Sequence, residues 1–336
     1  MQSWQVAVWE RLQQQHDRGS LAHAYLAYGE QGIGKFDLLR HFARYLLCKS
    51  PVTGSLCGTC VNCALAEGGA HPDVLIVAPE EGSRDIKIDQ IRSLAEFVAR
   101  TSHSGLMKVI VINQAHQLNV AAANSLLKTL EEPASKTVLF LVTERPGSLP
   151  ATLRSRCQRL QFATPAIGVT ADWLTAKGLT ASDALTLATA AGSRPLYALA
   201  LAERDGVNGA QDFLRQLSRL LQSQSLLQHC VAVALKLGEA VAVEYLLRAS
   251  TIVIRSLSQE EEPGDQVLAE VLHNLRAAAV RKEELLRKLL AFNALAEQAQ
   301  REVHGSTNPN PQLLLESLLW QWSKLGPVRH SSRARG

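Results

Sequence analysis

The sequence predicts an α/β unit built on a parallel sheet, followed by an all-helical part. Up to about residue 163, short apolar runs rich in β-branched residues alternate with helical patterns, which is typical of parallel strands joined by crossover helices. A glycine-rich loop follows the first run. Beyond residue 163 the chain carries Leu- and Ala-rich amphipathic segments. Since 336 residues exceed one typical hydrophobic core, we expect two or three domains.

The first domain is expected to contain five strands and crossover helices. The strands are predicted at residues 24–28, 74–77, 109–112, 138–142 and 158–162. The unbroken Val/Ile run at 109–112 is typical of a strand buried on both faces. One helix is predicted over residues 35–47 and another over 121–130, where Pro133 stops the pattern.

Four segments are expected along the chain. They are a nucleotide-type α/β domain at 1–163, a small helical domain at 164–205, a helical third domain at 206–326 and a basic, disordered tail at 327–336. Glycine-containing breaks at Gly178 and Gly192 divide the small domain, and Gly206 lies at its soft boundary with the third. Because the small domain cannot form a strong core alone, we expect it to pack on the first domain.

The composition favours a protein of the cytoplasm. No apolar run approaches the roughly 20 residues that span a bilayer. The first residues form a polar, helix-like stretch rather than a secretory signal. The net charge of +4 permits contact with nucleic acid without requiring it.

A cluster of cysteines follows the helix predicted at 35–47. With the spacing C-x8-C-x2-C-x2-C, its members are Cys48, Cys57, Cys60 and Cys63. Two overlapping C-x2-C steps let thiolates converge on one tetrahedral ion, and we expect Gly54, Gly58 and Asn62 to supply the tight backbone. Disulfides are not expected in a reducing compartment. The pattern favours a closed, structural Zn²⁺ site over an iron–sulfur cluster, a redox pair or unligated thiols.

Other cysteine and histidine residues are assigned no metal. Cys157 and Cys230 are isolated in the sequence, and we expect both to be packed. His71 could be imagined as a fifth ligand. With four thiolates already present, we expect instead a loop histidine satisfied by hydrogen bonds.

A phosphate-binding loop, GEQGIGKF, occupies residues 29–36 after the first predicted strand. In a Walker A loop the backbone N–H groups cradle phosphates, the Lys reaches them, and a final Ser or Thr holds Mg²⁺. The matching residues are Gly29, Gly32, Gly34 and Lys35. Phe36 stands in place of the hydroxyl, and a phenyl ring cannot ligate a hard cation. For this loop alone, a glycine-rich turn without a ligand is the alternative.

The second nucleotide motif has also lost its metal chemistry. A Walker B strand ends in an Asp that holds Mg²⁺, followed in many ATPases by a Glu that activates water. Here the strand predicted at 109–112 ends in Asn113 and Gln114, so both carboxylates are replaced by amides. Neither amide can act as a general base. We therefore expect no ATP hydrolysis, whereas weak or metal-free nucleotide binding through Lys35 remains open.

Three further motifs carry a family resemblance. They are AHQL at 115–118, AAANSLLKTLEEP at 121–133 and TLRSRC at 152–157. Together with the degraded Walker motifs and the cysteine insertion, they make essentially the whole chain resemble the AAA+ clamp-loader family of DNA replication. The resemblance implies an AAA+ module with an inserted zinc knuckle, a helical lid at 164–205 and an oligomerising collar at 206–326.

The resemblance also implies a role. It is that of a non-hydrolysing stator subunit in a hetero-pentameric ring, with ATP bound at subunit boundaries and no productive ATP or Mg²⁺ site in this chain. Its partners would be other loader subunits, the sliding clamp and primed DNA, within a DNA-directed DNA polymerase, a nucleotidyltransferase.

Individual residues take roles from the resemblance too. Arg156, in the motif Ser155-Arg156-Cys157, is implied to act in trans on a neighbour's ATP, as an arginine finger does. Thr143 lies at the family's sensor-1 position, next to a site that has lost its metal ligands. The segment around Arg194 resembles the sensor-2 region, but with Pro195 at a helix start the resemblance does not fix the register, so Arg194 is assigned no role as a phosphate contact.

Two rival functions make different demands on the sequence. An active ATPase motor subunit of the same family needs the Ser or Thr and the Asp that this chain lacks. A stand-alone zinc-dependent nucleic-acid-binding protein needs basic and aromatic residues among the cysteines. Between Cys48 and Cys63 the chain offers only Lys49 and no aromatic residue, which favours a structural zinc.

Overall fold

The computed structural model describes residues 1–52, 54–263, 265–278, 281–304 and 309–326. The chain divides into two compact units, Met1–Pro165 and Ala166–Gly336. Each unit has its own hydrophobic core. The tail at 327–336, expected to be disordered, lies outside the described residues.

A five-stranded parallel sheet forms the centre of the first unit, as the sequence predicts. Its order is β2-β3-β4-β1-β5. The strands are β1 (Ala24–Tyr28), β2 (Val74–Val77), β3 (Lys108–Ile112), β4 (Thr137–Thr143) and β5 (Gln158–Gln161). Every predicted strand is confirmed to within one residue at each end. All four strand pairings are parallel.

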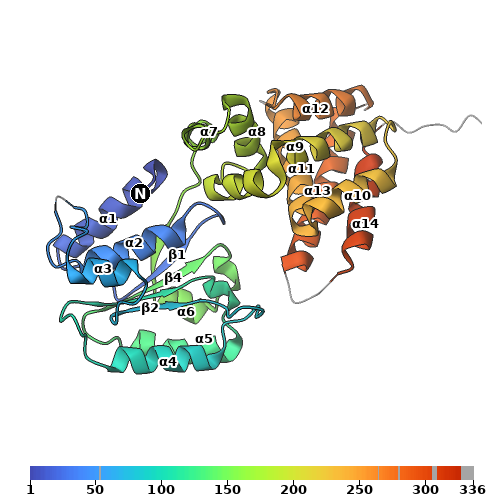
Figure 1. Ribbon diagram of the computed structural model, residues 1–336. Coiled ribbons are helices and arrows are strands. Elements are labelled where there is room, and N and C mark those ends of the chain that lie inside the picture. Colours follow the sequence, from blue (N-terminus) through green and yellow to red (C-terminus); the bar gives the residue numbers. More distant parts are fainter. Residues whose placement is uncertain (53, 264, 279–280, 305–308, 327–336) are drawn as a thin grey trace, which may run out of the picture. The chain divides into compact units, whose positions relative to one another are not determined.

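Helices cover both faces of this sheet (Figure 1). Helices α1 (Val6–Asp17) and α2 (Lys35–Leu47) pack on the face that carries Val109, Val111 and Phe140. Helices α4 (Ile88–Ala99) and α5 (Val120–Glu131) pack on the face that carries Ile110, Ile112 and Leu139. Because side chains alternate along a strand, the apolar run in β3 supplies both cores. The remaining elements are η1 (Ser3–Gln5), α3 (Val61–Glu67), η2 (Ala115–Gln117), η3 (Pro146–Ser148) and α6 (Ala151–Ser155).

The carboxyl edge of the sheet collects the nucleotide-type motifs. The strand register pairs Tyr28, just before the glycine-rich loop, with Thr143 at the end of β4. It also pairs Ile112, just before Asn113, with Leu141. Since parallel strands end at the same edge, the loop, Asn113 and Thr143 lie along one side of the unit.

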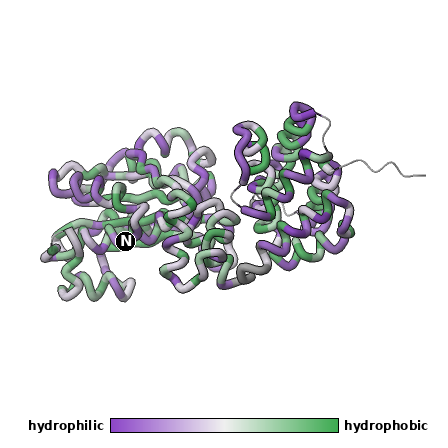
Figure 2. The backbone as a smooth tube through the Cα atoms, turned by 90° about the horizontal axis from the view of Figure 1, so that it is seen from above, coloured by the Kyte–Doolittle hydropathy of each residue, from purple (hydrophilic) through white to green (hydrophobic). Residues whose placement is uncertain are grey.

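The second unit is helical throughout its described residues. Its helices are α7 (Ile167–Ala176), α8 (Ala181–Ala190), α9 (Pro195–Leu221), α10 (Leu227–Leu237), α11 (Glu239–Gln259), α12 (Gln266–Ala278), α13 (Lys282–His304) and α14 (Pro311–Ser323). Hydrophobic and hydrophilic stretches alternate along them, as amphipathic helices require (Figure 2). Among the described residues, no helix combines the length and the apolar character needed to cross a membrane.

The small helices after residue 165 correct one expectation. They belong to the second unit rather than to the first. Leu174 of α7 and Leu187 of α8 share a buried core with Phe213 of α9. Helix α9 also continues through Gly206 and Gly209, so no turn marks the soft boundary predicted there. The division of this unit into a lid and a collar stays a prediction.

Candidate functional site

The glycine-rich loop has the backbone of a phosphate-binding loop. Gly32 and Gly34 have φ of 77° and 79°, in the left-handed region that favours glycine, and Gly34 is the N-cap of α2. A Cβ atom on Gly29 would lie 2.4 Å from the carbonyl oxygen of Phe162, just past β5. Packing against the sheet therefore requires a glycine at position 29 whether or not the loop binds a phosphate.

Lys35 points back into its own loop. Its side chain is buried, and Nζ donates to the carbonyl oxygens of Gly29 at 2.9 Å and Glu30 at 2.6 Å. A phosphate would have to exchange for these bonds to reach the ammonium group. The loop thus satisfies much of the hydrogen-bonding capacity of its own lysine.

The N-terminal turn η1 binds the other half of the loop, a contact that the sequence analysis missed. Trp4 Nε1 donates to the carbonyl oxygen of Ile33 at 3.0 Å. Gln5, which is buried, donates through Nε2 to the carbonyl oxygen of Gly34 at 2.9 Å. These contacts come from a segment nearly thirty residues earlier, so no local sequence pattern predicts them. They hold the backbone of the loop through side chains that are not part of it.

The place of the magnesium-binding hydroxyl is apolar. Phe36 is half-buried and packs against the core beneath α1 and α2. The guanidinium of Arg40 lies 5.9 Å from the centre of its ring. No oxygen ligand for Mg²⁺ is supplied by this side chain.

The end of β3 is occupied by interactions within the chain. Asn113 Oδ1 accepts a hydrogen bond from the N–H of Gln114 at 3.1 Å, and Gln114 has a left-handed φ of 55°. Thr143 is fully buried and accepts from the N–H of Arg145 at 3.0 Å. Its hydroxyl also lies 3.2 Å from His116 Nδ1. Thr143 therefore satisfies local groups in this structure.

His116 is a residue of this edge that sequence reasoning overlooked. Its side chain is 1% exposed, and Nε2 lies 3.1 Å from Glu144 Oε1. With Thr143 beside the other ring nitrogen, polar groups flank both nitrogens of the imidazole. The motif AHQL showed a histidine at this position, but not its two partners.

The four clustered cysteines converge as predicted. Their sulfur atoms all lie within 4.8 Å of one another, and those of Cys57 and Cys63 are 3.9 Å apart. Four thiolates about 2.3 Å from a tetrahedral ion would be roughly 3.8 Å apart. The donor set therefore fits a metal ion, with Gly54 and Gly58 in left-handed turns at φ of 76° and 70°.

Asn62 corrects one detail of this cluster. It was expected to form tight backbone, but it lies on helix α3 with its side chain buried. Its Nδ2 donates to the carbonyl oxygen of Leu47 at 2.8 Å, which ties the cysteine segment to the end of α2. Cys60 is the N-cap of α3 and its side chain accepts from the N–H of Cys63.

The thiols of the cluster differ in acidity. Backbone hydrogen bonds from Thr59 and Cys60 lower the pKa of Cys57 to about 6. Burial raises the pKa of Cys63 to about 12. A bound cation would be needed to bring all four sulfurs into the thiolate form at neutral pH.

Arg156 emerges from the end of α6 with two anchors. Its NH2 group lies 2.7 Å from Glu131 Oε1, and NH1 donates to the carbonyl oxygen of Thr152 at 3.0 Å. Its side chain is 37% exposed. Ser155 bonds back to Thr152, and Cys157 is buried, with its pKa raised by burial to about 11. Of the three motif residues, the arginine carries the charge.

Arg156 lies at the opposite edge of the sheet from the glycine-rich loop. The register pairs Tyr25 with Gln158, which places Arg156 near the level of His23 at the amino edge. The loop begins six residues later, at Gly29. At about 3.3 Å per residue, the separation along the strand is roughly 20 Å. Arg156 therefore cannot reach a phosphate in its own loop.

Arg194 is buried within the second unit. Its guanidinium pairs with Glu244 of α11, donates through Nε to the carbonyl oxygen of Ala191 and lies 4.0 Å from the centre of the Tyr197 ring. Arg248 shares the same carboxylate at 2.9 Å. These contacts join α9 to α11.

The structure also shows the surroundings of the isolated cysteines and of His71. Cys157 and Cys230 are both buried, as predicted. His71 is satisfied only at one nitrogen: Nδ1 accepts from the N–H of Asp73 at 3.0 Å, whereas the buried Nε2 has no hydrogen-bond partner among the described residues. His71 is therefore held by a hydrogen bond at one nitrogen and is not part of the cysteine cluster.

The chain is similar in sequence to subunits of DNA polymerase III. The family model described as DNA polymerase III, delta subunit, matches residues 4–166. The DNA polymerase III subunit delta' of Pseudomonas aeruginosa is 33% identical over 328 residues, which are 96% of this chain and 98% of that protein. The delta' subunit of Escherichia coli is 39% identical over 204 residues, 60% of this chain and 61% of that protein.

A solved structure supports the fold. The DNA polymerase III gamma subunit-related protein of Thermotoga maritima aligns with 94% of this chain and 98% of its own, with a TM-score of 0.50 at 19% identity. At that identity the likeness concerns the fold alone.

Proposed function

This chain belongs to the family of DNA polymerase III delta' subunits, and from that premise we propose that it is a non-hydrolysing stator of the clamp loader. In this role it takes part in ATP-dependent loading of the sliding clamp onto primed DNA. It supplies Arg156 in trans to the ATP of a neighbouring subunit. The single observation that carries the proposal is the separation of two features: a disabled nucleotide edge, and an exposed arginine at the opposite edge.

The disabled edge supports the absence of hydrolysis. Phe36 offers no oxygen to a cation, Asn113 offers only a neutral amide, and Gln114 cannot accept the proton of an attacking water. Lys35 is engaged by the carbonyls of its own loop. The remaining residues of this edge then have structural roles: the loop backbone for Gly29, Gly32 and Gly34, and local hydrogen bonds for Thr143.

The amino edge supports action in trans. A planar, permanently charged guanidinium can stabilise the charge that develops on a transferred phosphoryl group. Arg156 lies roughly 20 Å along the strand from its own loop, as the register and the rise per residue require. Its partial exposure leaves it accessible to another subunit.

The cysteine cluster is assigned to a structural Zn²⁺. Four sulfur ligands leave no open position for catalysis, and when bound the ion would clamp the segment between α2 and α3. Cys48 ends α2 and Cys60 begins α3, so the metal would fix the relative placement of these two helices.

The partners follow from the family. We assign the chain to a hetero-pentameric ring with subunits of the delta and gamma/tau type, acting on the sliding clamp and primed DNA. The ring is part of the DNA polymerase III holoenzyme, a DNA-directed DNA polymerase, and the protein is therefore cytoplasmic. Its second unit would hold the lid and the oligomerising collar.

The proposal is tested first on the purified chain. Steady-state ATP hydrolysis with Mg²⁺ should not exceed the buffer background. Turnover on the order of 1 s⁻¹, as in ordinary enzymes, would favour an active motor subunit instead.

A DNA titration of the purified chain tests the other rival. The stator role predicts weak binding to duplex and single-stranded DNA. Tight binding whose affinity falls steeply with salt would favour a stand-alone nucleic-acid-binding protein.

A further inference from the structure

Glu131 occupies an unfavourable position on its own helix. It is the last residue of α5, where the helix dipole presents partial negative charge and disfavours a carboxylate. Its side chain is 49% exposed, so burial does not explain it. The contact that offsets this placement is the 2.7 Å ion pair with NH2 of Arg156.

We propose that Glu131 is a positioning residue for Arg156: its carboxylate holds the guanidinium in the orientation that meets the ATP of the neighbouring subunit. The inference rests on the proposed function of Arg156. It adds a second residue, from a different helix, to the machinery that acts in trans.

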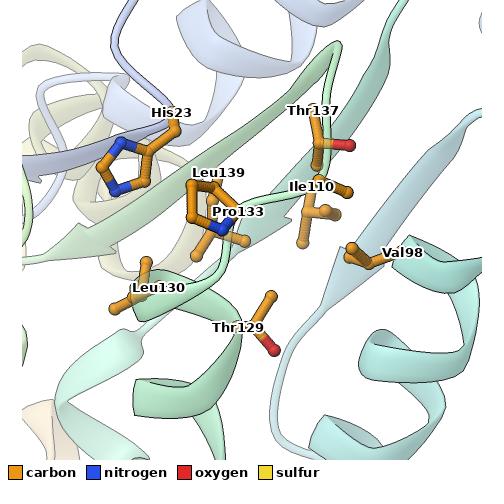
Figure 3. Close-up of a pocket in the computed structure, with 9 residues that line it drawn as sticks. His23, Val98, Ile110, Thr129, Leu130, Pro133, Thr137 and Leu139 are labelled. Carbon is orange, nitrogen blue, oxygen red and sulfur yellow. The ribbon is translucent and has the colours of Figure 1, made fainter.

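The turn that carries Glu131 is anchored to the sheet. Leu130 and Pro133, on either side of it, line one small hollow together with Leu139 of β4 (Figure 3). Leu130 is buried in the core beneath α4 and α5. A carboxylate directly after this buried leucine is attached to a restrained backbone, which is what a positioning group needs.

Two contacts fix the plane of the guanidinium. Glu131 holds NH2 and the carbonyl of Thr152 holds NH1, and the described residues offer the group no other polar partner. A guanidinium has five N–H donors, so these contacts leave donors for a phosphate. A free arginine side chain would lose rotamer freedom on reaching the transition state, whereas a held one has lost much of it in advance.

The positioning role makes a specific kinetic prediction. Glu131→Ala should lower the Arg156-dependent part of the ATPase rate about five-fold, as expected for a single exposed ion pair that orients a catalytic group. This part is the wild-type rate minus the rate with Arg156→Ala. The fall should appear in kcat with KM for ATP unchanged, because orientation matters most in the transition state. Glu131→Gln, which keeps an oxygen acceptor at the same place, should lose less than Glu131→Ala.

The experiment uses the reconstituted loader with sliding clamp and primed DNA. The variants are Glu131→Ala, Glu131→Gln, Arg156→Ala and the double variant, with the adjacent exposed Glu132→Ala as the matched control. Thermal unfolding of each purified chain checks that the fold is kept. In the double variant the effect of Glu131→Ala should vanish, because its action passes through Arg156.

The outcomes separate the two claims. An unchanged or faster ATPase with Glu131→Ala overturns the positioning role, a faster one meaning that Glu131 holds Arg156 back. An equal loss with Glu132→Ala, or a loss that persists beside Arg156→Ala, also overturns it. If Arg156→Ala itself leaves the rate unchanged, the proposed function fails.

Discussion

Asp73, just before β2, holds the loop that leads into β3. It is buried and accepts hydrogen bonds from the N–H groups of His103 and Ser104, both at 2.7 Å, and from the hydroxyl of Ser102 at 3.0 Å. Taken by itself, burial would raise the pKa of Asp73. The hydrogen bonds from Ser104, His103 and Ser102 outweigh it, so the pKa lies below its ordinary value.

Replacing this carboxylate should lower stability in a pH-dependent way. Because the folded-state pKa is depressed, the carboxylate stabilises the fold above its unfolded pKa of about 3.9, and this contribution is lost as pH falls through the folded pKa. Asp73→Asn should reduce the free energy of unfolding by about 1–3 kcal/mol at neutral pH, since an amide N–H₂ can face the donors. Urea denaturation at neutral and acid pH measures the difference, with the exposed Asp85→Asn as control. Equal stability of the variant and the wild type at neutral pH would contradict this account.

At the scale of residues, the sequence predicted chemistry better than contacts. The loss of metal ligands at Phe36 and Asn113 can be read directly, because ligand type is a property of the residue itself. The distant partners of the glycine-rich loop and of Arg156 could not be read. Trp4, which bonds the loop at Ile33, and Glu131, which pairs with Arg156, both come from elements distant in sequence. The position of Glu131 at a helix C-terminus was the one available signal.

At the scale of elements, the strands and the cysteine insertion were predictable, and the helix inside the insertion was not. A strand buried on both faces is apolar throughout, so the Val/Ile run of β3 predicts such a strand directly. Helix α3 begins inside the cysteine cluster, and its buried residues are Asn62 and Cys63. Where metal ligands take the inward positions of a helix, hydrophobic periodicity does not reveal it.

Loss of the metal should destabilise the segment between α2 and α3. Cys60→Ser removes one ligand but keeps an N-cap side chain, because serine is itself a favoured N-cap. The variant should lose its zinc and at least about 2 kcal/mol of stability. Metal content and thermal unfolding, each with and without a chelator, measure both effects. A chelator should lower the Tm of the wild type and not that of the variant; an unaffected wild type would refute a structural role for the metal.

Arg194 should prove structural. Arg194→Ala removes one partner of a carboxylate that is only 15% exposed, leaving Glu244 with Arg248. We expect a loss of about 2 kcal/mol in the free energy of unfolding, because a largely desolvated carboxylate loses one of its two cationic partners. Denaturant unfolding of the variant measures the loss. An unchanged stability together with a defective loader ATPase would instead assign Arg194 to a sensor of nucleotide.

At the scale of the whole molecule, the sequence predicted helices but not their partners. Amphipathic periodicity shows that α7 and α8 have an apolar face, yet it does not say which surface covers that face. They share the core of the second unit, contrary to the expectation that they pack on the first. Helix α9 likewise continues where the glycines suggested a boundary, since the cost of glycine in a helix is modest.

The two edges of the sheet in the first unit carry different features. The carboxyl edge keeps the architecture of a nucleotide site, with its lysine and its loop bound by the chain itself. The amino edge carries Arg156 and Glu131. Under the proposed function, the chain contributes Arg156 to a neighbour's ATP site, while its own glycine-rich loop supports no ATP hydrolysis.

A paired substitution tests this central claim most directly. In the reconstituted loader, ATPase with sliding clamp and primed DNA is compared for Lys35→Ala and Arg156→Ala. The account predicts an unchanged rate with Lys35→Ala. With Arg156→Ala it predicts a fall of about tenfold or more at the site that the arginine faces, with assembly intact. A rate lowered by Lys35→Ala and unaffected by Arg156→Ala would contradict it.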